Sequence, residues 1–202
     1  METSIPCFNL NIQTDFKVLK DVPHPEFLNH KDAIDQYYGI WKLFWMYVSN
    51  LKATKVLEFG TREGYYTQLF SHLLRANDGH IWTVDLADPK IYGEDKDKLD
   101  NVTFVKGNTL DPSLWNEPVD ILYIDDWHNG YHLFGELDRY AKYAKVILIH
   151  DVVQNWQTHE WLLPAIFSWC HRENLPFITY PLNPCGLVAI HREEFKNFYT
   201  SE

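Results

Sequence analysis

Residues 55–70, KVLEFGTREGYYTQLF, join an apolar strand-like segment to a helix-like segment through two glycines. Gly60 and Gly64 let a ligand approach the backbone, and a helix beginning near Tyr65 points free N–H groups at the junction. Such a place attracts a carboxylate or a phosphate. Glu58, at the end of the strand, opposes a phosphate but can accept a hydrogen bond from an ammonium group. The junction therefore favours a ligand that carries both an amine and a carboxylate.

The spacing of these glycines differs from that of two common phosphate-binding loops. The pattern is Glu-x-Gly-x-x-x-Gly, whereas dinucleotide-binding loops read Gly-x-Gly-x-x-Gly, and the Lys-Ser/Thr pair of nucleotide-triphosphate loops is missing. A strand-to-helix turn with glycines also occurs without any ligand. The interpretation therefore depends on residues elsewhere in the chain.

Polar residues also stand at the ends of four later apolar segments. These ends are Asp85, Asn108, Asp125 with Asp126, and His150 with Asp151. Asp85 follows the glycine loop by about twenty residues, where an acid can hold the two hydroxyls of a ribose. The amide of Asn108 can pair with the edge of a purine base. A single carboxylate could serve as a helix cap, but five polar strand ends together indicate a site.

The elements that must position these residues alternate between short strands and helices. Apolar residues recur at three- and four-residue steps from Asp32 to Leu51, which is typical of a helix with one buried face. Further helices are predicted over 65–76, 131–143 and about 158–173. Strands are predicted over 55–59, 80–85, 102–106, 119–125, 145–151, 176–180 and 186–192. The turn PLNPCG joins the last two strands into a hairpin.

This alternation predicts an α/β fold of the Rossmann-like kind. We expect a three-layer sandwich with a mostly parallel seven-stranded sheet and one antiparallel strand from the C-terminal hairpin. The carboxyl ends of parallel strands meet at one edge, so the polar residues should gather there. The chain has 202 residues and is 46% hydrophobic, which suits one domain with a full core. We predict an irregular N-terminal arm over 1–30 and a single domain over 31–202.

Composition also limits the partners. Lys and Arg number 18 against 28 Asp and Glu, and the few cations form no cluster, which disfavours nucleic acid. The apolar run IWKLFWMYV is too short for a membrane span and contains Lys42. Three widely spaced cysteines and the absence of a signal peptide pattern indicate a cytoplasmic protein. The sequence leaves a homo-oligomer open.

From Asp32 to Arg192, the chain resembles the class I S-adenosylmethionine-dependent methyltransferases. The resemblance is carried by VLEFGTREG, followed by VD, GN and ID at the intervals of that family, and by the closing hairpin. It implies that the methionine part of the cofactor is held by Glu58, Gly60, Thr61 and Gly64. It further implies that Asp85 binds the ribose, that Asn108 lies beside the adenine, and that Asp125 belongs to the cofactor site.

One position departs from the family's glycine loop. The commoner loop carries an additional glycine, and this chain has Arg62 in its place. The departure affects the contacts that the loop can make with a cofactor, but not the location of the loop.

A narrower resemblance lies in YIDDWHNGYHLFGELDRYAKYAKVILIHDVV. This segment is similar to metal-dependent small-molecule O-methyltransferases that act on catechols and on antibiotic sugars. The likeness implies that Asp125 and Asp151 bind Mg²⁺ or another divalent metal, and that His128 is the catalytic base, with Asp125 beside it. His150 is a third candidate metal ligand. Catechol-type enzymes have Asp and Asn where this chain has His150 and Asp151, and a histidine suits a softer metal. A metal-free enzyme that uses His128 alone stays open.

Two further residues lie on the helix that follows. His132 stands one helical turn after His128, which would allow a histidine pair as metal ligands, although Asn129 and Gly130 indicate that the helix begins later. Glu136 is expected to face solvent.

These patterns together predict an S-adenosylmethionine-dependent O-methyltransferase. Its acceptor would be the hydroxyl of a small molecule, such as a sugar, a catechol or a natural product, with or without a metal. The alternative is a non-catalytic module that keeps the fold and the cofactor pocket and serves in an assembly.

Overall fold

The computed structural model describes residues 31–89, 91, 99–152, 161–180 and 186–192, with side chains from Ile40 onward. The predicted N-terminal arm and the first residues of the predicted helix over 158–173 lie outside these ranges. Within them, no helix combines the length and the apolar character that crossing a membrane requires.

The helices and strands follow the order that the sequence predicts. The helices are α1 (Lys31–Leu51), α2 (Tyr65–Leu74), α3 (Gly130–Tyr140) and α4 (Leu162–Glu173), with short 3-10 turns η3 (Arg75–Asn77) and η5 (Ala141–Tyr143). The strands are β1 (Lys55–Phe59), β2 (His80–Asp85), β3 (Val102–Lys106), β4 (Val119–Ile124), β5 (Ala144–His150), β6 (Phe177–Tyr180) and β7 (Leu187–His191). The first three strands match their predicted bounds.

The strands form a seven-stranded sheet in the order β3-β2-β1-β4-β5-β7-β6. Neighbours from β3 to β5 pair in parallel, whereas β7 pairs antiparallel with both β5 and β6. The predicted Rossmann-like sheet with one antiparallel hairpin strand is thus confirmed. The chain order reverses between β1 and β4, and ligands of open α/β sheets bind at such a switch point.

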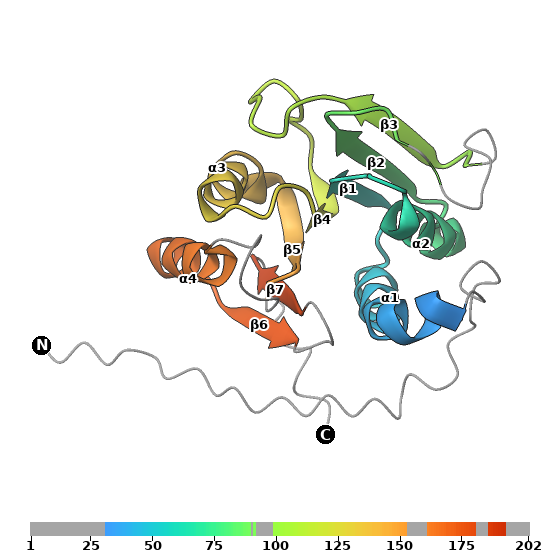
Figure 1. The fold of residues 1–202 in the computed structure, drawn as a ribbon, viewed down its shortest axis with the longest axis horizontal. Coiled ribbons are helices and arrows are strands. Elements are labelled where there is room, and N and C mark those ends of the chain that lie inside the picture. The colour runs from blue at the N-terminus through green and yellow to red at the C-terminus, as the bar shows by residue number, and fades with distance from the viewer. Residues whose placement is uncertain (1–30, 90, 92–98, 153–160, 181–185, 193–202) are drawn as a thin grey trace, which may run out of the picture.

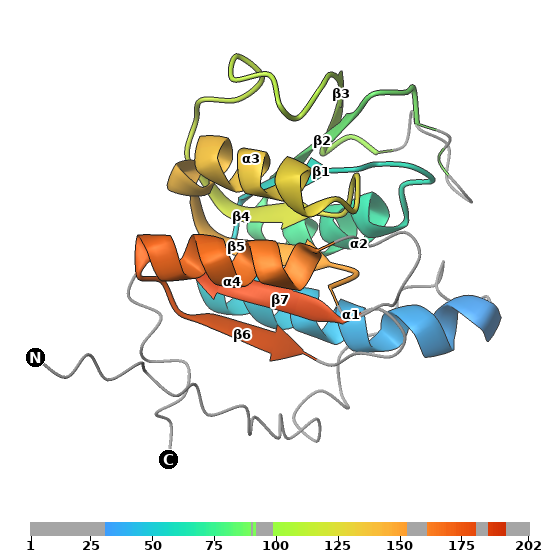
Figure 2. The ribbon, with the colours of Figure 1, turned by 60° about the vertical axis from the view of Figure 1, so that its left-hand side comes forward.

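Helices cover both faces of the sheet (Figure 1). One core lies between the sheet and the helices α1 and α2, and the other lies between the sheet and the helices α3 and α4. Figure 2 shows α3 and α4 side by side on their face. Neighbouring strand residues alternate between the two cores, as Val56 and Leu57 do, and β4 is buried along its whole length. Because both faces are buried, the strands read as apolar runs.

Candidate functional site

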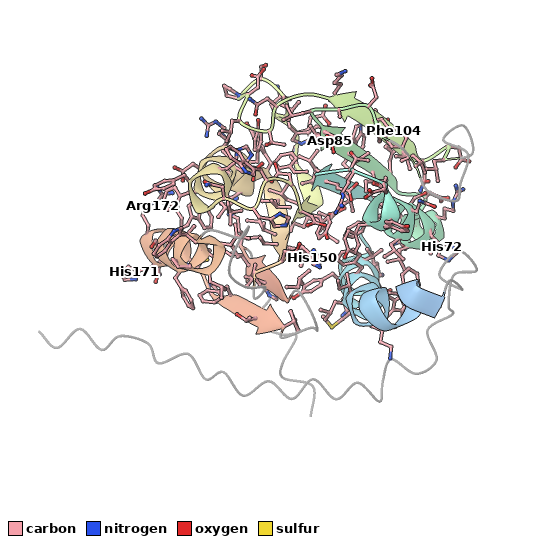
Figure 3. The ribbon with its side chains drawn as sticks, viewed as in Figure 1. His72, Asp85, Phe104, His150, His171 and Arg172 are labelled. Carbon is pink, nitrogen blue, oxygen red and sulfur yellow. The ribbon has the colours of Figure 1, made fainter. Side chains whose placement is uncertain are left out.

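The carboxyl ends of five strands meet at one edge of the sheet. Phe59 at the end of β1 is in register with Val84 of β2 and Ile124 of β4, and Ile124 is in register with Ile149 of β5. Asp85 is in register with Lys106 at the end of β3. Figure 3 shows Asp85 and His150 on opposite sides of the central strands β1 and β4. The polar residues that follow these strands therefore share one rim.

The glycine loop after β1 depends on a close approach between two backbones. Gly60 has φ +91°, and a Cβ at this position would lie 2.3 Å from the carbonyl oxygen of Asp125. Only glycine fits this conformation and this spacing without displacing the chain. Gly64, with φ +73°, precedes α2 and donates its N–H to the carbonyl of Thr61 at 2.7 Å. The loop thus brings the N-terminus of α2 next to the segment that carries Asp125.

Arg62 stands where the resembled family more often has a glycine, and its own backbone conformation favours glycine. Its φ is +47°, in the left-handed region that favours glycine. Its backbone N–H donates to the carboxylate of Asp85 at 3.0 Å. The side chain of Arg62 adds an exposed cation to the loop, paired with Glu63 at 2.9 Å.

Asp85 connects the loops after β1 and β2. Its Oδ2 accepts hydrogen bonds from the backbone N–H groups of Thr61 and Arg62, each at 3.0 Å, and its Oδ1 accepts one from Ala87 at 3.0 Å. The carboxylate thereby fixes the glycine loop. The sequence predicted a ribose ligand for this residue, and its position beside the loop suits that role.

Glu58 lies beneath the rim and not on it. Its side chain is 1% exposed and accepts a hydrogen bond from the hydroxyl of Thr67. Burial raises the pKa of Glu58 to about 8 against the opposing effect of this hydrogen bond. At neutral pH the group therefore carries a proton, and the structure does not bring it to the surface where a ligand's ammonium group would lie.

A pocket of about 290 Å³ opens at the rim, close to the smallest volumes of small-molecule sites, roughly 300 Å³. Its lining comprises Gly60, Arg62, Val84, Asp85, Leu86, Gly107, Asn108, Thr109, Asp125, Asp126, Trp127 and His132. Four of the residues predicted to bind the cofactor are thus brought together: Gly60, Asp85, Asn108 and Asp125. The other three, Glu58, Thr61 and Gly64, lie outside the lining.

Three groups from the β4 and β5 ends converge beside this pocket. Nε2 of His128 lies 3.4 Å from Oδ1 of Asp125 and 3.0 Å from Oδ2 of Asp151. The three side chains offer ligand atoms within 4.8 Å of one another. Asp151 has φ +56°, so the chain turns sharply after β5 where the predicted strand continued. The structure thus groups Asp125, His128 and Asp151 as predicted.

The two carboxylates control the charge of His128. Burial alone would lower the pKa of this histidine, but hydrogen bonds to Asp125 and Asp151 and their charges raise it to about 9. Burial raises the pKa of Asp125, and the neighbouring His150 and His128 more than reverse this effect, so the pKa falls well below its ordinary value. Without another cation, an imidazolium therefore lies between two carboxylates.

These distances also suit a divalent metal ion. Ligand atoms about 2.0–2.1 Å from an ion lie about 2.9 Å apart in an octahedral shell and about 3.3 Å apart in a tetrahedral one. The separations of 3.0 and 3.4 Å around His128 Nε2 fall at these values. Two carboxylates and one imidazole fit Mn²⁺ or Zn²⁺ as well as Mg²⁺. The donor set therefore fits the predicted metal.

His150, which was predicted as a metal ligand, lies behind this group. It is 5% exposed, its Nδ1 lies 3.2 Å from Oδ1 of Asp125, and its Nε2 lies 3.3 Å from the hydroxyl of Tyr66. The hydroxyl of Tyr123 donates to Oδ2 of Asp125 at 3.1 Å. Sequence reasoning missed both tyrosines, because aromatic residues in a strand and a helix stripe read as core.

Glu136 does not face solvent, and the prediction that it would is wrong. Its side chain is 0% exposed, and its Oε1 lies 3.2 Å from Nε2 of His132. The spacing of four residues on α3 places both side chains on one face of the helix. That spacing was the signal in the sequence: Glu136 lies three residues after Leu133, on the side of α3 that is buried.

Sequence comparison finds no matching family model and no matching curated protein. Comparison of structures does find similar folds. An O-methyltransferase from Bacillus cereus in complex with SAH superposes with a TM-score of 0.59, 16% sequence identity and coverage of 88% of this chain and 96% of that chain. TomG from Streptomyces achromogenes, an O-methyltransferase involved in tomaymycin synthesis, was solved in complex with SAM. It superposes with a TM-score of 0.56 and 14% sequence identity, and the match covers 87% of this chain and 94% of that chain.

A third similar structure is the SAH-bound methyltransferase PaMTH1 from Podospora anserina. Its TM-score is 0.58 at 15% identity, and the match covers 83% of this chain and 84% of that chain. The chain thus has the fold of class I S-adenosylmethionine-dependent methyltransferases.

Proposed function

We propose that this protein is an S-adenosylmethionine-dependent methyltransferase that methylates a hydroxyl group of a small molecule. The observation that carries the proposal is the convergence at one rim of a glycine loop, Asp85 and Asn108 around a pocket, with Asp125, His128 and Asp151 beside it. Two solved structures of the same fold, one in complex with SAH and one in complex with SAM, are O-methyltransferases.

The charge of the pocket supports a sulfonium cofactor over a dinucleotide. Three carboxylates, from Asp85, Asp125 and Asp126, line the pocket, against the cation of Arg62 and the imidazole of His132. Burial lowers the pKa of His132, but Asp126 and Glu136 raise it to about 10, so the lining keeps a net negative charge. Such a surface repels the pyrophosphate of NAD and attracts the positive sulfonium and ammonium groups of S-adenosylmethionine. We place the adenosine against Asn108 and Asp85, and the methionine part toward Gly60 and Asp125.

The group of Asp125, His128 and Asp151 would handle the acceptor. A divalent ion held there would lower the pKa of the acceptor hydroxyl and orient it. In the absence of an ion, His128 would accept the hydroxyl proton only in its neutral form. Burial lowers the pKa of His128, but Asp125 and Asp151 raise it to about 9, so turnover without a metal should increase as the pH rises toward that value. Holding the acceptor and the sulfonium side by side contributes to the rate by itself.

The test combines cofactor binding with methyl transfer. Wild-type chain and the variants His128→Asn and Asp151→Asn are incubated with methyl-labelled S-adenosylmethionine and a panel of sugars, catechols and phenolic natural products. We expect each variant to lose roughly a hundredfold or more in turnover and to bind the cofactor within about threefold of wild type. His171→Asn is the matched control, since this histidine is exposed on α4 (Figure 3).

Chelation separates the two ways of activating the hydroxyl. Loss of turnover in EDTA with recovery on addition of Mg²⁺ or Mn²⁺ would assign the ion, whereas full turnover in EDTA would assign His128 alone. Binding of the cofactor without methylation of any acceptor in the panel would contradict the proposed activity and favour a binding module.

A further inference from the structure

A second cluster of side chains that can bind a metal lies beyond the carboxyl end of β4. It consists of Asp126, His132 and Glu136. Asp125 and Asp126 are consecutive, but their carboxylates serve different neighbours. Asp125 faces His128 and His150, whereas Oδ2 of Asp126 accepts from the hydroxyl of Thr109 at 3.0 Å and lies 3.2 Å from Nε2 of His132. The methyl-transfer proposal uses the first group only.

Helix α3 positions two members of this second cluster. The side chain of Asn129 caps the helix by accepting from the backbone N–H groups of Tyr131 and His132. The helix therefore begins at Gly130, and His132 and Glu136 stand one turn apart on the side that faces Asp126. Asp126, His132 and Glu136 offer ligand atoms within 4.8 Å of one another.

A single ring nitrogen at the centre of the cluster faces three oxygens. Nε2 of His132 lies 3.0 Å from the hydroxyl of Thr109, 3.2 Å from Oδ2 of Asp126 and 3.2 Å from Oε1 of Glu136. One N–H cannot donate well to three acceptors. The same separations are those between ligand atoms around an ion at about 2.0–2.1 Å, which lie about 2.9–3.3 Å apart.

Glu136 points independently to a missing partner. Its side chain is 0% exposed, and among the residues that the structure describes the donor facing the carboxylate is Nε2 of His132, which lies 3.2 Å from Oε1 and is shared with Asp126 and Thr109. Nδ1 of His132 makes no hydrogen bond within the described ranges. A buried carboxylate that shares one imidazole with a second carboxylate is incompletely paired, so it takes up either a cation or a proton.

We propose that Asp126, His132 and Glu136 bind a divalent transition metal ion at a second site, separate from the group around His128. One imidazole and two carboxylates suit Zn²⁺ or Mn²⁺. Asp126 and His132 line the cofactor pocket, whereas Glu136 does not. An ion bound to all three would therefore hold the side chains of Asp126 and His132 in position in the pocket lining. The competing occupant is a proton, since burial raises the pKa of Glu136.

The experiment isolates this site by first removing the other one. The full chain carrying Asp151→Asn is stripped of metal and titrated with Co²⁺, whose absorption reports its ligands, and then with Zn²⁺ in competition. We expect this chain to bind Co²⁺ at a site that Zn²⁺ displaces. Adding Glu136→Gln should weaken that binding at least tenfold, roughly, because a charged ligand is replaced by a neutral amide. His171→Asn, added in place of Glu136→Gln, controls for exposed histidines and should change nothing.

Two measurements distinguish a loss of metal binding from a loss of folding. Circular dichroism and thermal melting of the metal-free variants show whether Glu136→Gln folds, and His132→Asn replaces it if it does not. A rise in Tm on adding Zn²⁺ to the Asp151→Asn chain, and its loss in the double variant, is the second expected result. Equal Co²⁺ binding with and without Glu136→Gln, or no binding by the Asp151→Asn chain, would overturn the second site and assign the buried carboxylate to a proton. Neither result affects the methyl-transfer proposal, which is tested at His128.

Discussion

Replacing Glu58 by Gln should make the protein more stable at neutral and alkaline pH. Burial raises the pKa of Glu58 from 4.5 to about 8 in the folded chain. The folded state therefore binds a proton that the unfolded state has released between these two values. Stability is full below pH 4.5 and falls as the pH rises toward 8. A glutamine in this place has no proton to lose, and its carbonyl can still accept from Thr67.

The size of the effect follows from the same change in pKa. At about 1.4 kcal/mol per pH unit, the loss reaches about 3 kcal/mol at pH 7 and about 5 kcal/mol above pH 8. These figures need no reduction for solvent screening, because the side chain is 1% exposed. The difference in unfolding free energy between the variant and wild type should therefore grow with pH.

The assay is urea unfolding at pH 5, 6, 7, 8 and 9, followed by tryptophan fluorescence, with both chains compared at each pH. Glu117→Gln is the control, because it removes a carboxylate that is 63% exposed. Parallel stability curves for wild type and Glu58→Gln across this range would refute the reasoning, since they would show that no proton is taken up on folding at this position.

Two further substitutions test the frame of the site. Gly60→Ala should destabilise the chain by more than about 2 kcal/mol and weaken cofactor binding, because the added Cβ would clash with the backbone of Asp125. The measurement is urea unfolding. Gly135→Ala is the control, because a Cβ at that position would contact side chains only. Asp120→Asn should cost about 1–3 kcal/mol at pH 7, because its carboxylate accepts from two backbone N–H groups and from Lys145. Folding lowers the pKa of Asp120, so the stability that its carboxylate gives is lost as the pH falls. The difference in unfolding free energy between Asp120→Asn and wild type should therefore narrow toward pH 3. A difference that stays constant with pH would contradict this prediction.

The sheet was predictable because its central strands, β4 and β5 among them, are buried on both faces. Their apolar runs leave little choice of element, and the alternation of strands with helices then predicts a parallel sheet. The ends of β4 and β5 are each one residue shorter than predicted. Asp151 takes a left-handed conformation there, which a pattern of apolar residues does not record.

The location of the site was predictable from the sequence, whereas the burial of its individual side chains was less so. The end of a predicted strand shows that a residue lies near the rim of the sheet. It does not show whether the side chain of that residue reaches the surface. Glu58 lies buried next to Thr67, and Glu136 faces inward from α3. The error at Glu136 comes from the expectation that carboxylates are exposed, which fails where a neighbouring imidazole offsets the cost of burial.

The most direct test of the account is calorimetric titration of the folded chain with S-adenosylmethionine and, separately, with NAD. The account predicts saturable binding of S-adenosylmethionine at about one molecule per chain, no binding of NAD, and weaker binding by Gly60→Ala. Absence of heat with S-adenosylmethionine over a range of temperatures, in protein that unfolds cooperatively, would contradict the central claim that the rim holds this cofactor.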